Sequence, residues 1–178
     1  MKKLLFLLLP CLLLCISPRL HAQPDGVMQG YNGEWNHTKS QILALAEATP
    51  QEKYSWRPAP GVRSISEVYM HIAIANFYYV GLMGIKTPDV SDDKLETSVT
   101  KKADVIDWLK RSFAALEAAR AQLKPGDLDR KLKVWDMDVT VDDIYLRAII
   151  HNAEHMGQAI AYARMNGIVP PWSKPAAK

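Results

Sequence analysis

The sequence contains very little cysteine, and all of it lies at one end. Only Cys11 and Cys15 occur among the 178 residues, and both fall inside an apolar run near the N-terminus. The rest of the chain therefore has no disulfide, no thiolate metal ligand and no cysteine nucleophile. Any metal bound there must use histidine or carboxylate side chains, and the fold must be held together by its core.

The sequence also lacks a strong excess of charge of either sign. Its formal net charge of +3 comes from 22 basic and 19 acidic residues, and the first 22 residues contribute three bases and no acid. A neutral body without a basic block offers no electrostatic footprint for nucleic acid, so we expect no nucleic-acid partner. With 48% hydrophobic and 23% charged residues, the composition is that of a folded globular protein rather than a disordered chain.

The first 22 residues have the layout of a secretory signal peptide. Two lysines precede an apolar run over residues 4–16, and small residues follow up to Ala22. The run has 13 residues, whereas a transmembrane helix needs about 20. We expect cleavage after Ala22, export to the periplasm or the medium, and a mature single domain over residues 23–178 with no membrane attachment. An uncleaved anchor and a lipoprotein attached through one of the two cysteines are the alternatives at this stage.

Four segments carry apolar residues at helical spacing. Pro50 ends the first segment, a capping box over residues 64–67 starts the second, and Pro125 ends the third. Residues 127–139 form at most a short extended piece, and no alternation of strands and helices occurs. The pattern predicts an all-α four-helix bundle. The helices are expected at residues 33–49, 64–84, 100–124 and 141–166.

The histidines differ in their positions on these helices. His21 belongs to the expected signal peptide, and His37 is turned away from the apolar face of the first helix. His71 lies on the inward face of the second helix. His151 and His155 are four residues apart on the last helix, so their rings project from one face about one turn apart, a spacing that suits two imidazoles on one cation.

The heights of these histidines can be compared along the bundle. His71 lies 13 residues before the expected end of the second helix, and the midpoint of the other two lies 12 residues after the start of the fourth. If the two helices are antiparallel neighbours, these offsets of about 20 Å and about 18 Å bring the three rings to one level. The spacing therefore predicts a three-histidine site for one divalent metal with an open position, and unconnected histidines are the alternative.

The same segment also reads as the inverted zincin pattern H-x-x-E-H over residues 151–155. In that pattern Glu154 would be the general base of a protease. The sequence disfavours this reading because no acidic residue follows Glu154 to act as a third ligand. Glu154 also points about 100° away from His155 around the helix.

Several segments, taken in order, resemble the DinB/YfiT-like superfamily of four-helix bundles. The matching segments are YSWRPAPGVRS at 54–64, EVYMHIA at 67–73, HNAEHMGQ at 151–158 and GIVPPWS at 167–173. Together they span about residues 30–173. The resemblance implies an up-down-down-up bundle with a long second crossover and a homodimer. It also implies that His71, His151 and His155 are the metal ligands.

Three imidazoles suit zinc, nickel or iron. The resemblance implies a metal-dependent hydrolase or transferase acting on a small molecule that the sequence does not identify. Some similar proteins are mycothiol-dependent maleylpyruvate isomerases and bacillithiol transferases, but their thiols are cytosolic, so the export signal argues against a thiol cosubstrate. A non-catalytic metal-binding or dimeric interaction protein is the alternative. Glu67 and Gln158 are candidates for hydrogen bonds to the outer nitrogens of the histidines.

Overall fold

The computed structural model of the chain describes residues 27–173. The expected signal peptide, residues 1–22, lies outside the described residues. None of the helices within 27–173 is both long and apolar enough to cross a membrane.

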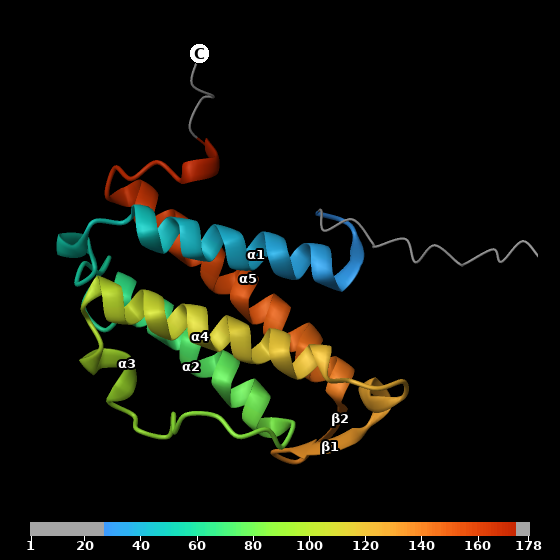
Figure 1. Ribbon diagram of the computed structural model, residues 1–178. Coiled ribbons are helices and arrows are strands. Elements are labelled where there is room, and N and C mark those ends of the chain that lie inside the picture. Colours follow the sequence, from blue (N-terminus) through green and yellow to red (C-terminus); the bar gives the residue numbers. More distant parts are fainter. Residues whose placement is uncertain (1–26, 174–178) are drawn as a thin grey trace, which may run out of the picture.

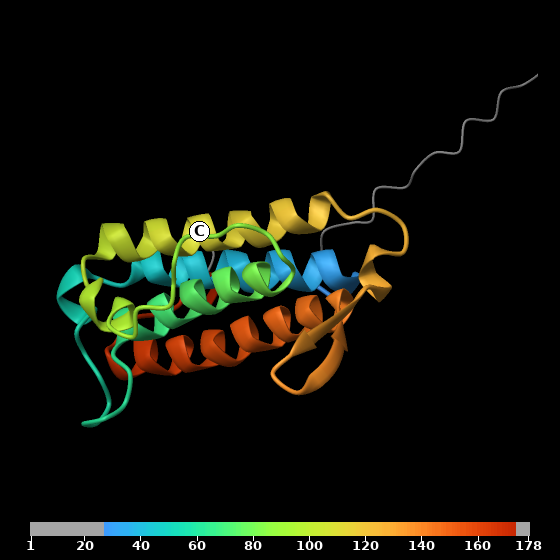
Figure 2. The ribbon, with the colours of Figure 1, turned by 90° about the horizontal axis from the view of Figure 1, so that it is seen from below.

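Four long helices pack side by side along most of the length of the molecule (Figures 1 and 2). They are α1 (Gly30–Ala48), α2 (Ile65–Leu82), α4 (Lys102–Ala121) and α5 (Val141–Met165). The colour gradient in Figure 1 shows that α1 and α5 run in one direction and that α2 and α4 run in the other. The fold is therefore an all-α, up-down-down-up four-helix bundle, which confirms the prediction.

Local capping sets where the two site-bearing helices begin. Ser64 caps α2, since its hydroxyl accepts a hydrogen bond from the Glu67 amide while the Glu67 carboxylate accepts one from the Ser64 amide at 2.8 Å. Thr140 and Asp143 form the same reciprocal box at the start of α5. Such boxes satisfy amide donors that the first turn of a helix leaves free. They fix the residue at which each helix begins, and therefore the height of the histidines along it.

The core lies between the four helices and is filled by large apolar side chains. Burying each of these contributes roughly 1.5–3 kcal/mol relative to leaving it exposed. Helix α2 contacts α4, α5 and the small helix α3. Fully buried members of the core include Ile42, Leu45, Met70, Ile72, Leu109, Phe113, Leu116 and Tyr145.

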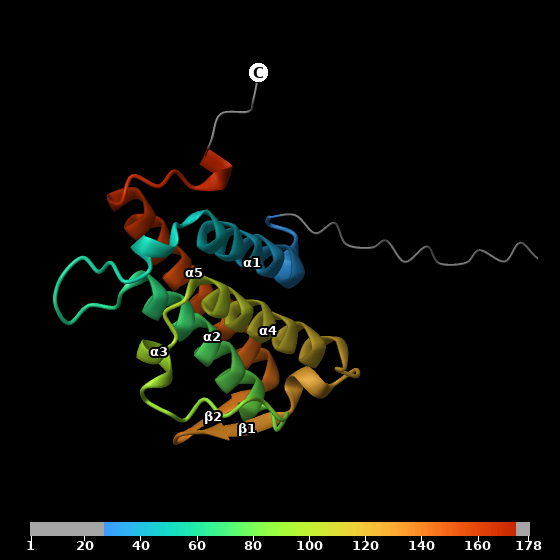
Figure 3. The same cartoon turned by 60° about the vertical axis from the view of Figure 1, so that its left-hand side comes forward.

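Two connections contain structure that the helical pattern did not predict in detail. The long crossover after α2 contains the short helix α3 (Leu95–Ser98), which lies beside α2 (Figure 3). The segment before α5 forms an antiparallel hairpin of β1 (Lys131–Val134) and β2 (Met137–Thr140), so the expected extended piece is a two-stranded ribbon. Short 3₁₀ turns occupy Gln51–Lys53, Asp127–Asp129 and Pro171–Ser173.

Candidate metal centre

The structure brings together the three histidines that the sequence analysis selected. His71 comes from α2 and the other two from α5, and one nitrogen of each lies within 4.8 Å of the others. The His71 ring centroid is 5.1 Å from that of His151 and 4.7 Å from that of His155, and the two α5 rings are 4.5 Å apart. The rings meet at one level because α2 and α5 are antiparallel.

The spacing of the inner nitrogens fits a small divalent ion. The Nε2 atoms of His71 and His151 are 3.2 Å apart. Two imidazole nitrogens at 2.0–2.1 Å from a tetrahedral ion would be separated by about 3.3 Å. The pair therefore has the separation of two ligands that share one metal.

Two of the outer nitrogens have partners that orient the rings. Glu96 Oε2 lies 2.9 Å from His71 Nδ1, and Gln158 Oε1 lies 2.8 Å from His155 Nδ1. Carboxylate and amide oxygens accept hydrogen bonds, so both Nδ1 atoms are donors and both Nε2 atoms keep a free lone pair. This is the arrangement by which proteins fix the tautomer of a metal-binding histidine. His151 Nδ1 is buried and has no hydrogen-bond partner among the described residues.

Burial keeps the α5 histidines neutral. Desolvation, helped by the nearby His155 and His71, lowers the pKa of His151 from 6.5 to about 3. Desolvation is also the main cause that lowers the pKa of His155. Both imidazoles are therefore neutral near pH 7, which is the form that binds metal.

One predicted outer partner is confirmed and the other is wrong. Gln158 contacts His155 as expected, and its amide also donates to the Tyr162 hydroxyl at 2.9 Å. The Glu67 carboxylate instead takes part in the capping box and in an ion pair with Arg57 at 2.6 Å, and no hydrogen bond joins it to His71.

Glu96 takes the place that was expected for Glu67. Burial alone would raise the pKa of Glu96, but hydrogen bonds from His71 and Arg63 outweigh it and lower that pKa. Glu96 was missed because it lies on α3, in a crossover without helical periodicity and 25 residues from His71 in sequence. An acidic residue inside a long polar crossover was the only sequence signal available.

The remaining candidate residues lie away from the centre. Glu154 is exposed and pairs with Arg147 through two contacts of 3.2 and 2.7 Å, so it does not face the histidines as a zincin base would. His37, on α1, does not belong to the histidine cluster found among the described residues.

A cavity of about 580 Å³ adjoins the centre. Glu96 and Gln158, which hold two of the histidines, form part of its wall. Arg57 and Arg63 from the loop before α2 line it as well. The cavity therefore lies against the outer partners of the histidines, and the three histidines are not among the residues that line it.

Comparison with known proteins assigns the fold to a family. A family model described as the DinB superfamily matches residues 34–159. No curated protein matches the chain at a significant level. Among solved structures, a DinB-like protein from Bacillus cereus is 20% identical with a TM-score of 0.70, and the match covers 81% of this chain and 95% of that one.

Two Bacillus subtilis structures are similar at comparable coverage. A DinB-like protein is 20% identical with a TM-score of 0.61, over 80% of this chain and 97% of that one. YfiT, described as a probable metal-dependent hydrolase with an unusual four-helix bundle topology, is 12% identical with a TM-score of 0.62, over 81% of this chain and 91% of that one. At these identities the likeness shows the shared fold.

Proposed function

The chain belongs to the DinB superfamily, and from that premise we propose that it is an exported metal-dependent hydrolase. Its divalent ion would be held by His71, His151 and His155. The observation that carries the proposal is the convergence of three imidazole nitrogens within 4.8 Å. The outer partners of two of these imidazoles, Glu96 and Gln158, line a cavity. The description of YfiT as a probable metal-dependent hydrolase supports the same reaction class.

Three protein ligands leave a coordination position for water, as in catalytic rather than structural sites. A divalent ion of the zinc, nickel or iron type would supply a water whose pKa is lowered toward neutral pH. Neighbouring side chains orient the ligands. Glu96 and Gln158 hold the rings of His71 and His155 in the tautomer that leaves Nε2 free. Burial keeps His151 uncharged.

Metal analysis followed by a substrate screen tests the proposal. Mature wild-type protein, loaded separately with zinc, nickel and iron, should bind one ion per chain and hydrolyse at least one ester, amide or phosphoester. His71→Ala should lose both properties, whereas His37→Ala should keep both because His37 lies outside the cluster. A protein that binds metal but hydrolyses no substrate would support the non-catalytic alternative. A wild type that binds no metal would refute the proposal.

The export part of the proposal depends on the N-terminal sequence pattern and is tested separately. Protein recovered from an exporting host should begin at Gln23, within a residue or two. Intact-mass measurement decides this, and a mass that retains residues 1–22 would refute export by cleavage.

A further inference from the structure

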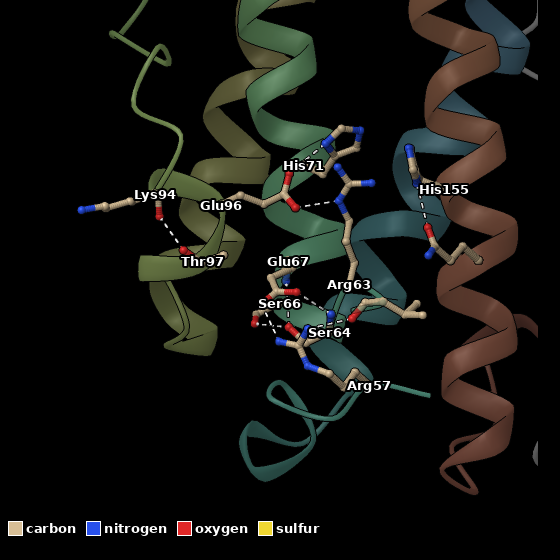
Figure 4. Close-up of polar contacts among 12 residues, drawn as sticks. Arg57, Arg63, Ser64, Ser66, Glu67, His71, Lys94, Glu96, Thr97 and His155 are labelled. Atoms are coloured by element: carbon tan, nitrogen blue, oxygen red, sulfur yellow. Dashed lines mark hydrogen bonds and ion pairs between the residues drawn. The ribbon is translucent and has the colours of Figure 1, made fainter. Parts of the chain in front are cut away.

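Arg63 is attached to the histidine centre by a single carboxylate. Its Nε donates to Glu96 Oε1 at 2.6 Å, and the other oxygen of Glu96 lies 2.9 Å from His71 Nδ1. Figure 4 shows the guanidinium group of Arg63 beside the His71 ring, on the side that faces α5 and His155. The bond at Nε therefore fixes the direction in which the rest of the guanidinium points.

The outer nitrogens of Arg63 are left available. Within residues 27–173, Nη1 and Nη2 of Arg63 have no protein acceptor, and the side chain is 40% exposed in the cavity wall. Arg57, in the same wall, differs in this respect. Its Nη1 donates to the Val62 carbonyl at 2.7 Å and its Nη2 to Glu67 at 2.6 Å. Of these two arginines, only Arg63 has both Nη groups without a partner among residues 27–173.

The charges around the cavity favour an anionic ligand. Glu67 is paired with Arg57, and Glu96 is shared between Arg63 and His71. The two arginines thus balance the two carboxylates, and a divalent ion on the histidines would make the site positive. A planar guanidinium with two parallel N–H donors matches the two oxygens of a carboxylate or phosphate.

We propose that the substrate carries an oxyanion, either a carboxylate or a phosphate, which Arg63 binds through Nη1 and Nη2 beside the metal. This inference rests on the proposed hydrolase function and names the substrate class for it. Arg63 is then the residue that selects the substrate by its charged group, while Glu96 holds that guanidinium and the His71 ring in one fixed arrangement.

Anion titration tests the role of Arg63 without any need to know the substrate. Zinc-loaded protein is titrated with acetate and, separately, with inorganic phosphate at constant ionic strength, and binding is followed by calorimetry. Arg63→Gln should weaken the preferred anion at least about tenfold, because a charged two-point contact is lost. Arg63→Lys keeps the charge but not the paired donors, so its anion affinity should lie between those of wild type and Arg63→Gln. The stronger of the two anions identifies the group that the site prefers.

Arg111→Gln is the matched control. Arg111 also donates from Nε to a carboxylate, that of Asp107 at 2.7 Å, but it lies on the exposed surface of α4. The control removes the same charge and the same kind of bond, so its anion affinity should stay within about twofold of wild type. Equal anion affinity in wild type and Arg63→Gln, with metal bound in both, would overturn the inference.

Parallel titrations of the metal-free protein separate the two proposals. The Arg63 donors exist without the ion, so phosphate or acetate should still bind more weakly to Arg63→Gln than to wild type. If this difference is seen in a protein that takes up no metal, the hydrolase proposal fails and the anion site stands. If metal binds but the anions do not distinguish wild type from Arg63→Gln, the anion site alone fails.

Discussion

Helices α2 and α5 are joined by two polar clusters. One of them is closed to solvent, and the other, the open cluster of three histidines, is held by side chains that line a cavity. In the closed cluster, Asn152 donates to Asn76 Oδ1 at 3.0 Å and Asn76 donates to Ser112 Oγ at 3.2 Å. Ser112 in turn donates to the Leu109 carbonyl at 2.9 Å. The two asparagines and the serine are all 0% exposed.

The histidine cluster lies close by, since His151 and Asn152 are consecutive residues, yet its polar atoms are used differently. Amide and hydroxyl groups of the closed cluster donate to and accept from one another, and among the described residues only Oδ1 of Asn152 in this cluster is buried without a partner. In the open cluster, the Nε2 atoms of His71 and His151 face each other at 3.2 Å, and the Nδ1 partners of His71 and His155 leave the Nε2 lone pairs of those two rings free. That arrangement is complementary to a cation, whereas the asparagine cluster forms most of its hydrogen bonds within the protein.

Removing a metal ligand should give the largest effect, a loss of zinc affinity that leaves the closed cluster intact. His151→Ala should weaken zinc binding by at least about 100-fold, because one of three protein ligands is lost. Its free energy of unfolding without metal should change by less than about 1 kcal/mol, since the helices keep their apolar faces. Competition with a chromogenic chelator and urea denaturation measure the two quantities. Full zinc affinity in this variant would exclude His151 as a ligand.

Asn76→Ala should have the next largest effect, and it should lower stability rather than metal binding. It leaves the buried Asn152 amide and the Ser112 hydroxyl without their partner, which should cost about 2 kcal/mol of unfolding free energy. Zinc stoichiometry should stay at the wild-type value. Urea denaturation and metal analysis of the same preparation check both expectations. Loss of metal with unchanged stability would mean that the two clusters are not separate in their roles.

Much of this contrast could be predicted from the sequence, and the features that could not be predicted have physical causes. The helix starts were predictable because Ser64 starts a capping box, and the meeting of the histidines was predictable because their offsets match in antiparallel helices. The asparagine cluster was missed, although Asn76 and Asn152 are polar residues on otherwise apolar faces. Glu96 was not predictable because it reaches His71 from an irregular crossover, whose path depends on tertiary packing rather than on periodicity.

Removal of Glu96, the outer partner of His71, should have a smaller effect on zinc affinity than removal of a ligand. Glu96→Ala should weaken zinc binding about tenfold, because His71 loses the acceptor that fixes its ring and raises its basicity. Glu67→Ala is the control for this change. It should lower stability through loss of the α2 capping box while leaving zinc affinity within about twofold. The reverse pattern, with Glu67 controlling metal affinity, would restore the original expectation.

Acid should separate the clusters further, since only one of them titrates. In the metal-free protein the pKa of His151 is about 3, below the 6.5 of an ordinary histidine. Between these two pH values the His151 imidazole is protonated in the unfolded chain but not in the native state, which favours unfolding. This contribution to stability is complete above about pH 6.5 and is lost as pH falls toward about 3, by at most about 1.4 kcal/mol per pH unit. Urea denaturation at pH 7 and 5 should show a smaller loss for His151→Asn than for wild type. Asn76→Ala should keep the wild-type pH dependence.

The smallest effect is expected at Glu154, which lies between the two α5 histidines in sequence but not in space. Its carboxylate is exposed and paired with Arg147, and removal of an exposed ion pair costs no more than about 1 kcal/mol. Glu154→Gln should therefore leave zinc affinity, and turnover of any substrate found in the screen, within about twofold of wild type. A zincin base would instead be essential, because it must take the proton of the attacking water. A drop in turnover of 100-fold or more with zinc still bound would show that Glu154 turns inward and acts on substrate. The open cluster would then extend around α5 beyond the three histidines.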